Sequence, residues 1–308
     1  MSLEMKRLFS ALAFSILFSS PALADAVGDY RNLTQAAETA IEKGKLKEAE
    51  ASLLKASAKA KGAGPAYKYY ADSLIELGRL YDRKKQIDAA SQKYNEALAV
   101  YTKAYGRDTL QAAECFHGLG ELYRHHKLYT KAVPWYTKAI AVRRKAAPNH
   151  PTLAESEYGL AKTYLQLKQY TEAQPYLKNA LAIQEKVYGY NSKKMVRTLF
   201  DLANAYEGAN QGSMAIPTYK KVIAILETTY GPNNPKVATT YEKLSSIYLK
   251  KQNYKSAEIA CKRSLAIREK GKDRQKLKKS LNDYIAVLKK QNKMDEAKKL
   301  EKRLAAIK

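Results

Sequence analysis

The chain has 308 residues, of which 45% are hydrophobic, and its 55 Lys and Arg against 30 Asp and Glu give a formal net charge of +25. This hydrophobic content permits an extensive buried core and excludes wholesale disorder. Only 14 Gly and 9 Pro are present, which leaves few breaks in the chain and favours long helices over the frequent turns of an all-β domain.

The first 24 residues have the pattern of an export signal. Lys6 and Arg7 precede an apolar stretch over residues 8–20, and Ala22-Leu23-Ala24 fits a small-residue cleavage site. The apolar stretch is well short of the roughly 20 residues that cross a bilayer, so a cleaved signal peptide is favoured over a retained membrane anchor. We therefore expect a secreted or periplasmic protein whose mature chain begins near residue 25.

One pattern then recurs along the chain: Leu followed by a small residue, Tyr three residues later, then Ala and an aromatic or apolar residue four positions further. It is clearest over residues 77–97 and recurs at 119–139, 160–180, 202–222 and 244–264. Weaker copies flank these five, at residues 37–56 and 285–304. The shared alanine recurs every 40 to 42 residues, at Ala49, Ala90, Ala132, Ala173, Ala215, Ala257 and Ala297.

Each copy is predicted to form two antiparallel helices. In the first helix, Leu74, Leu77, Gly78 and Tyr81 follow the i, i+3, i+4, i+7 spacing of one apolar helical face. The small residue allows a second helix to approach closely, and a ring such as Tyr94 on that helix fills the gap between repeats. Small opposite large side chains therefore predict interlocking helix pairs.

Turn signals separate the helices. Short polar segments such as residues 84–86 join the two helices of a copy, and Tyr-Gly pairs such as Tyr105-Gly106 end the second helix. We expect one domain over residues 25–308 with seven helix pairs, at approximately 29–65, 66–107, 108–149, 150–191, 192–233, 234–272 and 273–308.

These residues resemble the tetratricopeptide repeat, whose signature is Leu-Gly, Tyr, Ala and an aromatic residue at this spacing. The longer period and the joint at residues 230–235 are similar to the kinesin-light-chain type. The resemblance implies an all-α, right-handed superhelical solenoid whose concave surface, lined mainly by each repeat's first helix, binds an extended peptide or a partner protein without catalysis. That type often carries Asn just before the Leu-Ala pair. This chain instead carries Glu76, Gly118, Gly159, Asp201 and Lys243 there, so kinesin-like cargo peptides are not implied.

A candidate groove follows from the first-helix face beside the packing stripe. Mixed-charge and aromatic residues repeated along such a wall suit a ligand with apolar anchors and both charge signs. For any single residue, ordinary solvated helix surface is an equally good interpretation. The candidate groove residues are Arg79, His117, Glu121, Tyr158, Lys162, Phe200, Asn204 and Glu242.

The end of the chain is strongly basic. Residues 250–308 contain 20 basic and 7 acidic residues, which leaves +13. This charge would attract an anionic partner, such as membrane lipid, acidic cell-wall polymer, nucleic acid or an acidic protein. It would equally serve as the polar outer face of a terminal repeat. We favour the solubilising cap and expect no specific nucleic-acid site, because Lys greatly outnumbers Arg and lacks its planar fork.

Chemical motifs are scarce. Cys115 and Cys261 lie three to four repeats apart, too far for an intramolecular disulfide. The possible metal ligands His117, His125 and His126 with Cys115 do not follow a zinc spacing and point in different directions on one helix. No nucleophile motif, phosphate-binding loop or dinucleotide fingerprint appears. We therefore expect no metal, cofactor or enzymatic activity. The sequence favours an exported adaptor with a peptide groove over a basic envelope protein held by anionic polymer or lipid.

Overall fold

The repeated pattern folds as helices throughout residues 21–61 and 67–307, which are the residues that the computed structural model describes. These residues form fourteen α-helices and one 3-10 helix and contain no strand, which confirms the predicted all-α class. In chain order the helices are α2 (Pro21–Glu42), α3 (Leu46–Lys61), α4 (Tyr67–Arg83), α5 (Ile87–Tyr105), α6 (Leu110–His125), α7 (Tyr129–Ala146), α8 (Pro151–Gln166), α9 (Tyr170–Tyr188), η2 (Lys193–Met195), α10 (Val196–Gly208), α11 (Gly212–Tyr230), α12 (Pro235–Lys250), α13 (Tyr254–Glu269), α14 (Arg274–Lys290) and α15 (Met294–Ala305).

The turn inside each helix pair has the same backbone geometry. After the first helix, one residue adopts the left-handed conformation, which ends an α-helix and reverses the chain. The next backbone N–H then bonds back to the helix, as from Gln86 to the Tyr81 carbonyl at 2.9 Å and from Gln211 to the Tyr206 carbonyl at 2.8 Å. The left-handed residues are Gly44, Lys85, Lys127, Lys168, Asn210, Gln252 and Asn292. Their spacing of 40 to 42 residues is that of the shared alanines.

The joints between pairs end and restart helices by local signals. Gly106, Gly189 and Gly231 follow a tyrosine and end α5, α9 and α11 with φ between 81° and 93°, a region that side chains disfavour. Helix α12 begins at a proline, and the side chain of Asn234 accepts a hydrogen bond from the Lys236 N–H at 2.9 Å. The joints therefore separate one pair from the next.

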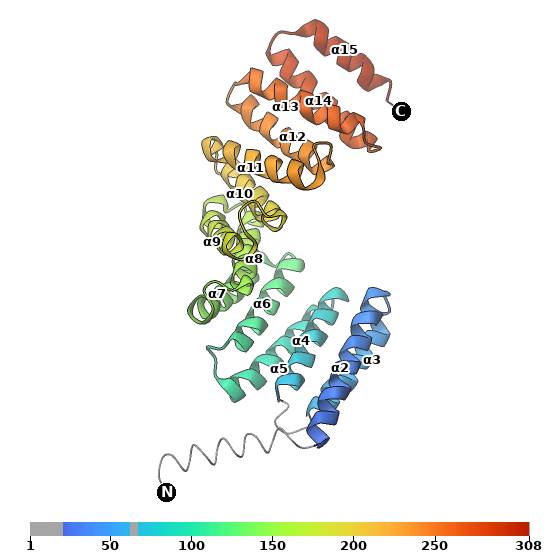
Figure 1. The fold of residues 1–308 in the computed structure, drawn as a ribbon, viewed down its shortest axis with the longest axis vertical. Coiled ribbons are helices and arrows are strands. Elements are labelled where there is room, and N and C mark those ends of the chain that lie inside the picture. The colour runs from blue at the N-terminus through green and yellow to red at the C-terminus, as the bar shows by residue number, and fades with distance from the viewer. Residues whose placement is uncertain (1–20, 62–66, 308) are drawn as a thin grey trace. The chain divides into compact units, whose positions relative to one another are not determined.

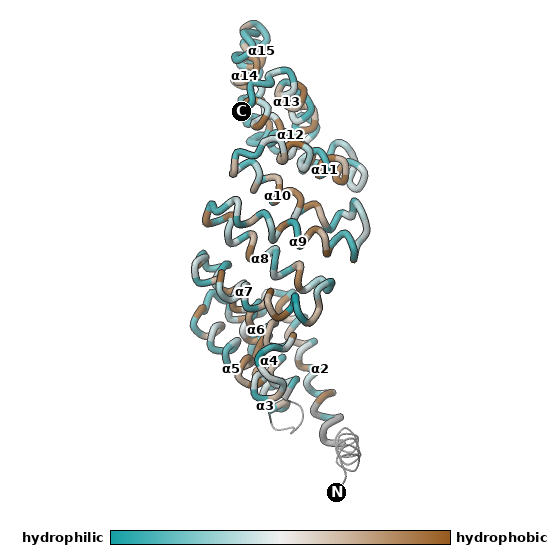
Figure 2. Tube along the Cα trace, turned by 90° about the vertical axis from the view of Figure 1, so that its left-hand side faces the viewer, coloured by the Kyte–Doolittle hydropathy of each residue, from teal (hydrophilic) through white to brown (hydrophobic). Residues whose placement is uncertain are grey.

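The described chain divides into two compact units, α2–α7 over residues 21–148 and α8–α15 over residues 149–307. In each unit the helices pack as consecutive pairs, and each pair packs against the following one (Figure 1). Hydrophobic and hydrophilic residues alternate along the helices, as Figure 2 shows, so that apolar faces meet between helices. This arrangement is that of a tetratricopeptide-repeat solenoid.

The tyrosine rings occupy the gaps that the small residues leave. Tyr94 on α5 is 2% exposed and lies between Gly78 of α4 and Gly118 of α6. Tyr136 on α7 is fully buried against Gly120 of α6. The predicted pairing of small with large side chains is thus confirmed in residues 21–148.

The predicted export signal, residues 1–24, lies outside the described residues apart from residues 21–24, which belong to the first turns of α2. Among the helices within 21–61 and 67–307, none is both long and apolar enough to span a membrane.

Candidate binding faces of the first helices

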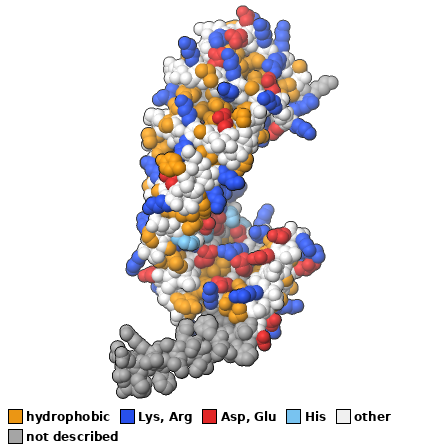
Figure 3. Space-filling model, viewed as in Figure 1, with side chains coloured by type: hydrophobic (Ala, Val, Ile, Leu, Met, Phe, Trp, Pro, Cys, Tyr) orange, Lys and Arg blue, Asp and Glu red, His pale blue; other side chains and the backbone are white. Residues whose placement is uncertain are grey.

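In residues 21–148, Arg79 belongs to a network of charged side chains on α4, α6 and α7. Its guanidinium pairs with Glu76 on its own helix and with Glu114 on α6, the latter at 2.5 Å. Glu114 also accepts from Arg143 of α7 at 2.5 Å, and Arg143 is only 2% exposed. Figure 3 shows acidic and basic side chains next to one another over this part of the first-helix face. The network joins neighbouring helix pairs.

Glu121 and His117 on α6 contact the following helix. Tyr136 donates its hydroxyl proton to Glu121, and the His117 ring packs edge-on against the Tyr136 ring with centroids 5.7 Å apart. Burial would raise the pKa of Glu121, but hydrogen bonds from His125 and Arg124 hold it well below its usual range. Burial, followed by the nearby Arg143 charge, lowers the pKa of His117 to about 4. His117 is therefore neutral at pH 7.

Two histidines at the end of α6 bridge back to α4. Asp82 Oδ2 lies 2.7 Å from His125 Nδ1, and Asp82 Oδ1 lies 3.0 Å from His126 Nε2. The hydrogen bond to Asp82, followed by that to Glu121, raises the pKa of His125 to about 9. His125 is thus protonated at neutral pH and pairs with carboxylates on two helices. Within the described ranges no group of three or more His, Cys, Asp or Glu residues could hold a metal ion.

In residues 149–307, Tyr158 connects the first helices of two successive pairs. It is 8% exposed, and its hydroxyl on α8 donates to Asp201 Oδ2 of α10 at 2.5 Å. The Lys162 ammonium lies 5.8 Å from the centre of the Tyr158 ring and the Arg197 guanidinium 4.8 Å from it. Lys162 and Arg197 thus place their charges over a ring that is almost fully buried.

Phe200 and Asn204 both contact Tyr219 of α11. The Phe200 and Tyr219 rings meet edge-to-face with centroids 5.5 Å apart, and the Tyr219 hydroxyl donates to Asn204 Oδ1 at 2.7 Å. The same hydroxyl lies 3.1 Å from Glu207 Oε2. Phe200 and Asn204 remain half-buried, so the groove face of α10 presents an aromatic ring beside an amide.

Glu242 on α12 is largely withdrawn from solvent. Its side chain is 9% exposed and accepts from Arg268 of α13 at 2.9 Å and from Ser280 of α14 at 3.0 Å. Lys279 lies 3.6 Å away. Glu242 thus connects three helices, and the predicted groove at this position contains a buried ion pair.

Two pockets adjoin on the first-helix face of residues 149–307. One, of about 350 Å³, lies among η2, α10, α11 and α12 and has an apolar wall that includes Phe200. The other, of about 280 Å³, lies among α10, α12 and α14 and includes the carboxylates of Glu207 and Asp283. Burial raises the pKa of Asp283. Thr239 lines both pockets, so they are direct neighbours along α12.

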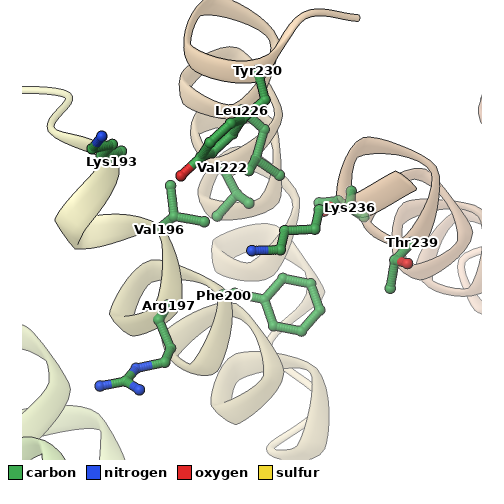
Figure 4. Close-up of a pocket in the computed structure, with 10 residues that line it drawn as sticks. Lys193, Val196, Arg197, Phe200, Val222, Leu226, Tyr230, Lys236 and Thr239 are labelled. Carbon is green, nitrogen blue, oxygen red and sulfur yellow. The ribbon is translucent and has the colours of Figure 1, made fainter. Parts of the chain in front are cut away.

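The first pocket contains residues that sequence reasoning missed. Val222 and Leu226 of α11, both fully buried, line its floor, and Arg197 and Lys236 contribute charge from α10 and α12. Figure 4 shows Lys236 extending so that its Nζ lies beside Phe200 and Val222, whereas the Arg197 guanidinium points away from them. The sequence did contain a signal for this pocket. Counted from the shared alanine of each pair, the position of Leu226 is occupied by Arg143 in α7 and by Arg268 in α13.

The basic residues of α14 and α15 are partly paired with acids. The acids of four of the five pairs already count in the net charge of +13 over residues 250–308, so the pairing does not lower this charge by itself, and attraction to an anionic surface stays a prediction. The pairs are Lys276 with Asp273 at 3.1 Å, Lys279 with Glu242 at 3.6 Å, Lys289 with Glu301 at 2.7 Å, Lys293 with Glu258 at 2.7 Å, and Arg303 with Glu269.

The two cysteines are structural. Cys115 on α6 and Cys261 on α13 are buried free thiols in different units. Cys261 Sγ lies 2.9 Å from the Ser245 hydroxyl of α12, so it packs between the helices of its pair. Burial raises the pKa of Cys115 to about 12 and that of Cys261 to about 11. Neither thiol has the low pKa of a catalytic nucleophile.

Comparisons with known proteins identify the repeat. The family model described as tetratricopeptide repeat matches residues 30–103, 90–145, 152–228 and 211–270. A search of curated proteins found no match.

Solved structures share the fold. BtubC (BKLC) from P. vanneervenii is 21% identical with a TM-score of 0.59, over 73% of this chain and 90% of that chain. A putative kinesin light chain with nearly identical TPR-like repeats from Podosopora anserina is 22% identical with a TM-score of 0.57, over 66% and 96%. The apo form of RapI is 18% identical with a TM-score of 0.69, over 90% and 76%. The repeat pattern, the stacked helix pairs and the family match agree that the chain belongs to the tetratricopeptide-repeat family.

Proposed function

We propose that the protein is an exported, non-catalytic adaptor that binds an extended segment of another protein along the first-helix face of residues 149–307. The observation that carries this proposal is the pair of adjoining pockets that share Thr239. Tetratricopeptide-repeat proteins are typically non-catalytic scaffolds that bind protein or peptide partners. A concave face with two successive pockets suits a ligand that extends across several repeats.

The two pockets differ in chemistry. The α10–α11–α12 pocket offers an aromatic and aliphatic wall that includes Phe200, whereas the α10–α12–α14 pocket offers carboxylates together with Lys243 and Lys279. Lys243 already pairs with Glu207 at 3.1 Å, so the second pocket is polar without a large net charge. An apolar anchor in the first pocket and hydrogen-bonding groups in the second would fix the register of a bound segment.

Affinity capture from an envelope extract tests this groove. Phe200→Ala removes the half-buried ring at the first pocket, and Ile259→Ala removes a 64% exposed apolar side chain from α13 as a matched control. We expect Phe200→Ala to lose the partner that wild type and Ile259→Ala retain, at both low and high salt. Loss of the partner from all three proteins at high salt would instead favour attraction to the basic α14–α15 region. Equal capture by Phe200→Ala and wild type would contradict the groove assignment.

Export is proposed from the pattern of residues 1–24. Cell fractionation followed by N-terminal sequencing of the recovered protein tests it. We expect a mature chain that begins near residue 25 in the envelope or the medium. A chain with an intact N-terminus in the cytoplasm would contradict export without affecting the groove assignment.

A further inference from the structure

Pairs of residues 29 positions apart face each other across the two helices of a repeat, and their chemistry changes along the chain. Arg143 on α7 bonds to Glu114 on α6, and Arg268 on α13 bonds to Thr239 on α12 at 2.8 Å. In both pairs the arginine is at most 5% exposed and fills the space beside the first helix. An arginine of the second helix thus fills this space in these two pairs, whereas in the α4–α5 pair the buried Tyr101, which donates its hydroxyl to Asp72 across the same separation, fills it.

The α10–α11 pair replaces this arrangement. The same register places Arg197 on the first helix and Leu226 on the second, so the filling arginine is missing and the acid or hydroxyl partner is replaced by a cation. Val222 takes the position held by Ala139 and Ser264 in the other two pairs. The space that an arginine fills elsewhere is here an apolar pocket of about 350 Å³.

Every charged residue that lines this pocket is basic, although the Arg197 guanidinium points away from the apolar wall and lies over the Tyr158 ring. Lys193, Arg197 and Lys236 line it, and no acidic residue does. Within the described residues, no carboxylate forms an ion pair with any of the three. Lys236 lies 5.9 Å from the centre of the Tyr230 ring, and its Nζ extends over the apolar wall (Figure 4). A cation beside an apolar cavity suits a ligand that has an anionic group at one end and is otherwise apolar.

We propose that the α10–α11–α12 pocket binds a small amphiphile, a medium-length hydrocarbon chain that ends in a carboxylate. The chain would lie against the partly exposed Val196 and Phe200, and the carboxylate would pair with Lys236. This site goes beyond the binding of a protein segment, because a free small molecule needs none of the rest of the groove.

The size of the pocket selects the class of ligand. Its volume is at the lower end of small-molecule sites and equals about a dozen water molecules in the liquid. Octanoate, with about ten non-hydrogen atoms, is of that size. A pocket of this volume has room for one short chain, whereas docking on a bilayer needs a broad exposed apolar or basic surface. We therefore commit to the free amphiphile rather than to a bilayer.

Titration calorimetry of the purified full chain with octanoate tests the proposal, with octan-1-ol and octylamine as neutral and cationic probes of the same chain length. We expect saturable binding of one octanoate per chain, roughly fivefold or more tighter than octan-1-ol, and no saturable binding of octylamine. Lys236→Met should weaken octanoate binding roughly three- to tenfold, whereas Lys255→Met, which removes an exposed charge from α13, should leave it unchanged.

A double variant transfers the chemistry of another pair into this one. Arg197→Glu combined with Leu226→Arg recreates the arrangement of Glu114 and Arg143, and its arginine should fill the pocket. We expect this variant to keep its helical circular dichroism and to lose octanoate binding. If it does not fold, Lys236→Met still decides the question.

Three outcomes would overturn the proposal. They are the absence of octanoate binding by wild type, equal affinity for octan-1-ol and octanoate, and equal octanoate affinity in Lys236→Met and wild type. Binding of anionic vesicles or of an acidic peptide without any binding of octanoate would also contradict it, by assigning the cations to another kind of partner. None of these results depends on the capture of a protein partner.

Discussion

Replacing Gly118 by Ala should destabilise residues 21–148, although Ala normally stabilises a helix relative to Gly. A Cβ at Gly118 on α6 would lie 2.4 Å from Cε1 and 2.9 Å from Cδ1 of the Tyr94 ring. That ring cannot withdraw, because a Cβ at Gly78 on its other side would already lie 3.0 Å from its Cζ. Tyr94 is also 2% exposed, so no open space is available to it.

The magnitude follows from two opposing terms. Ala in a helix interior is about 1 kcal/mol more favourable than Gly. Overpacking a filled core costs about 1–3 kcal/mol, and a contact this far inside the usual carbon–carbon separation belongs to the upper part of that range. We therefore expect Gly118→Ala to lower the free energy of unfolding by about 1–2 kcal/mol. Gly28 on α2 has no atom within 4 Å of such a Cβ, so Gly28→Ala should raise it by up to about 1 kcal/mol.

Urea unfolding measures both changes. Trp135 on α7 is the single tryptophan of the chain and stacks on Phe116 of α6 with centroids 6.1 Å apart, so its fluorescence reports on the altered region. The unfolding of Gly28→Ala, whose substitution lies on α2, is followed by far-UV circular dichroism. Adding Tyr94→Leu should remove most of the cost of Gly118→Ala, since the ring is the atom group that clashes. A rise in stability on Gly118→Ala comparable to that of Gly28→Ala would refute the reasoning.

Three further predictions concern titration, a buried charge and thiol access. The folded-state pKa of His125 is about 9, above its ordinary 6.5, so the stability that protonated His125 contributes is complete below pH 6.5 and is lost as pH rises through 9. Because the side chain is about half exposed, unfolding experiments should show that this rise in pH lowers the free energy of unfolding by about 1 kcal/mol, a loss that His125→Gln abolishes. Glu114→Gln should lower the free energy of unfolding by about 1–3 kcal/mol in urea titrations, because it removes the negative charge beside the 2% exposed Arg143. Iodoacetamide should modify Cys115 and Cys261 slowly in the native protein at pH 8 and rapidly in urea, as mass spectrometry would show, since burial raises both thiol pKa values.

The helices and turns could be predicted because their signals are local. The left-handed turn residue recurs with the same spacing as the shared alanine, and both depend on sequence within one helical hairpin. Tyr94 could likewise be assigned to a gap opposite Gly78, because the positions of small and large residues repeat. Neither inference needs a contact between distant pairs.

The roles of the groove residues could not be predicted from spacing alone. An i, i+4, i+7 pattern identifies one face of a helix but does not show which side chains reach that face from a neighbour. Tyr158 belongs to the predicted face, yet Asp201 of the next pair binds its hydroxyl. Glu242 belongs to it as well, yet Arg268 and Ser280 draw it into a buried cluster. The predicted helix face therefore gave the positions of these residues but did not show whether their side chains are accessible to a ligand.

The register of residues 29 apart explains how a repeat protein can vary its surface while keeping its packing. A buried arginine such as Arg143 requires a carboxylate such as Glu114, because an unpaired buried charge is strongly destabilising. A leucine such as Leu226 requires no partner, and the shorter side chain leaves space. Two substitutions therefore convert a filled polar contact into an apolar pocket without altering the alanines and tyrosines that hold the helices together. We therefore expect that exchanging these two positions alone is enough to open or to fill this space in a helix pair, and Arg197→Glu with Leu226→Arg makes the change that fills it.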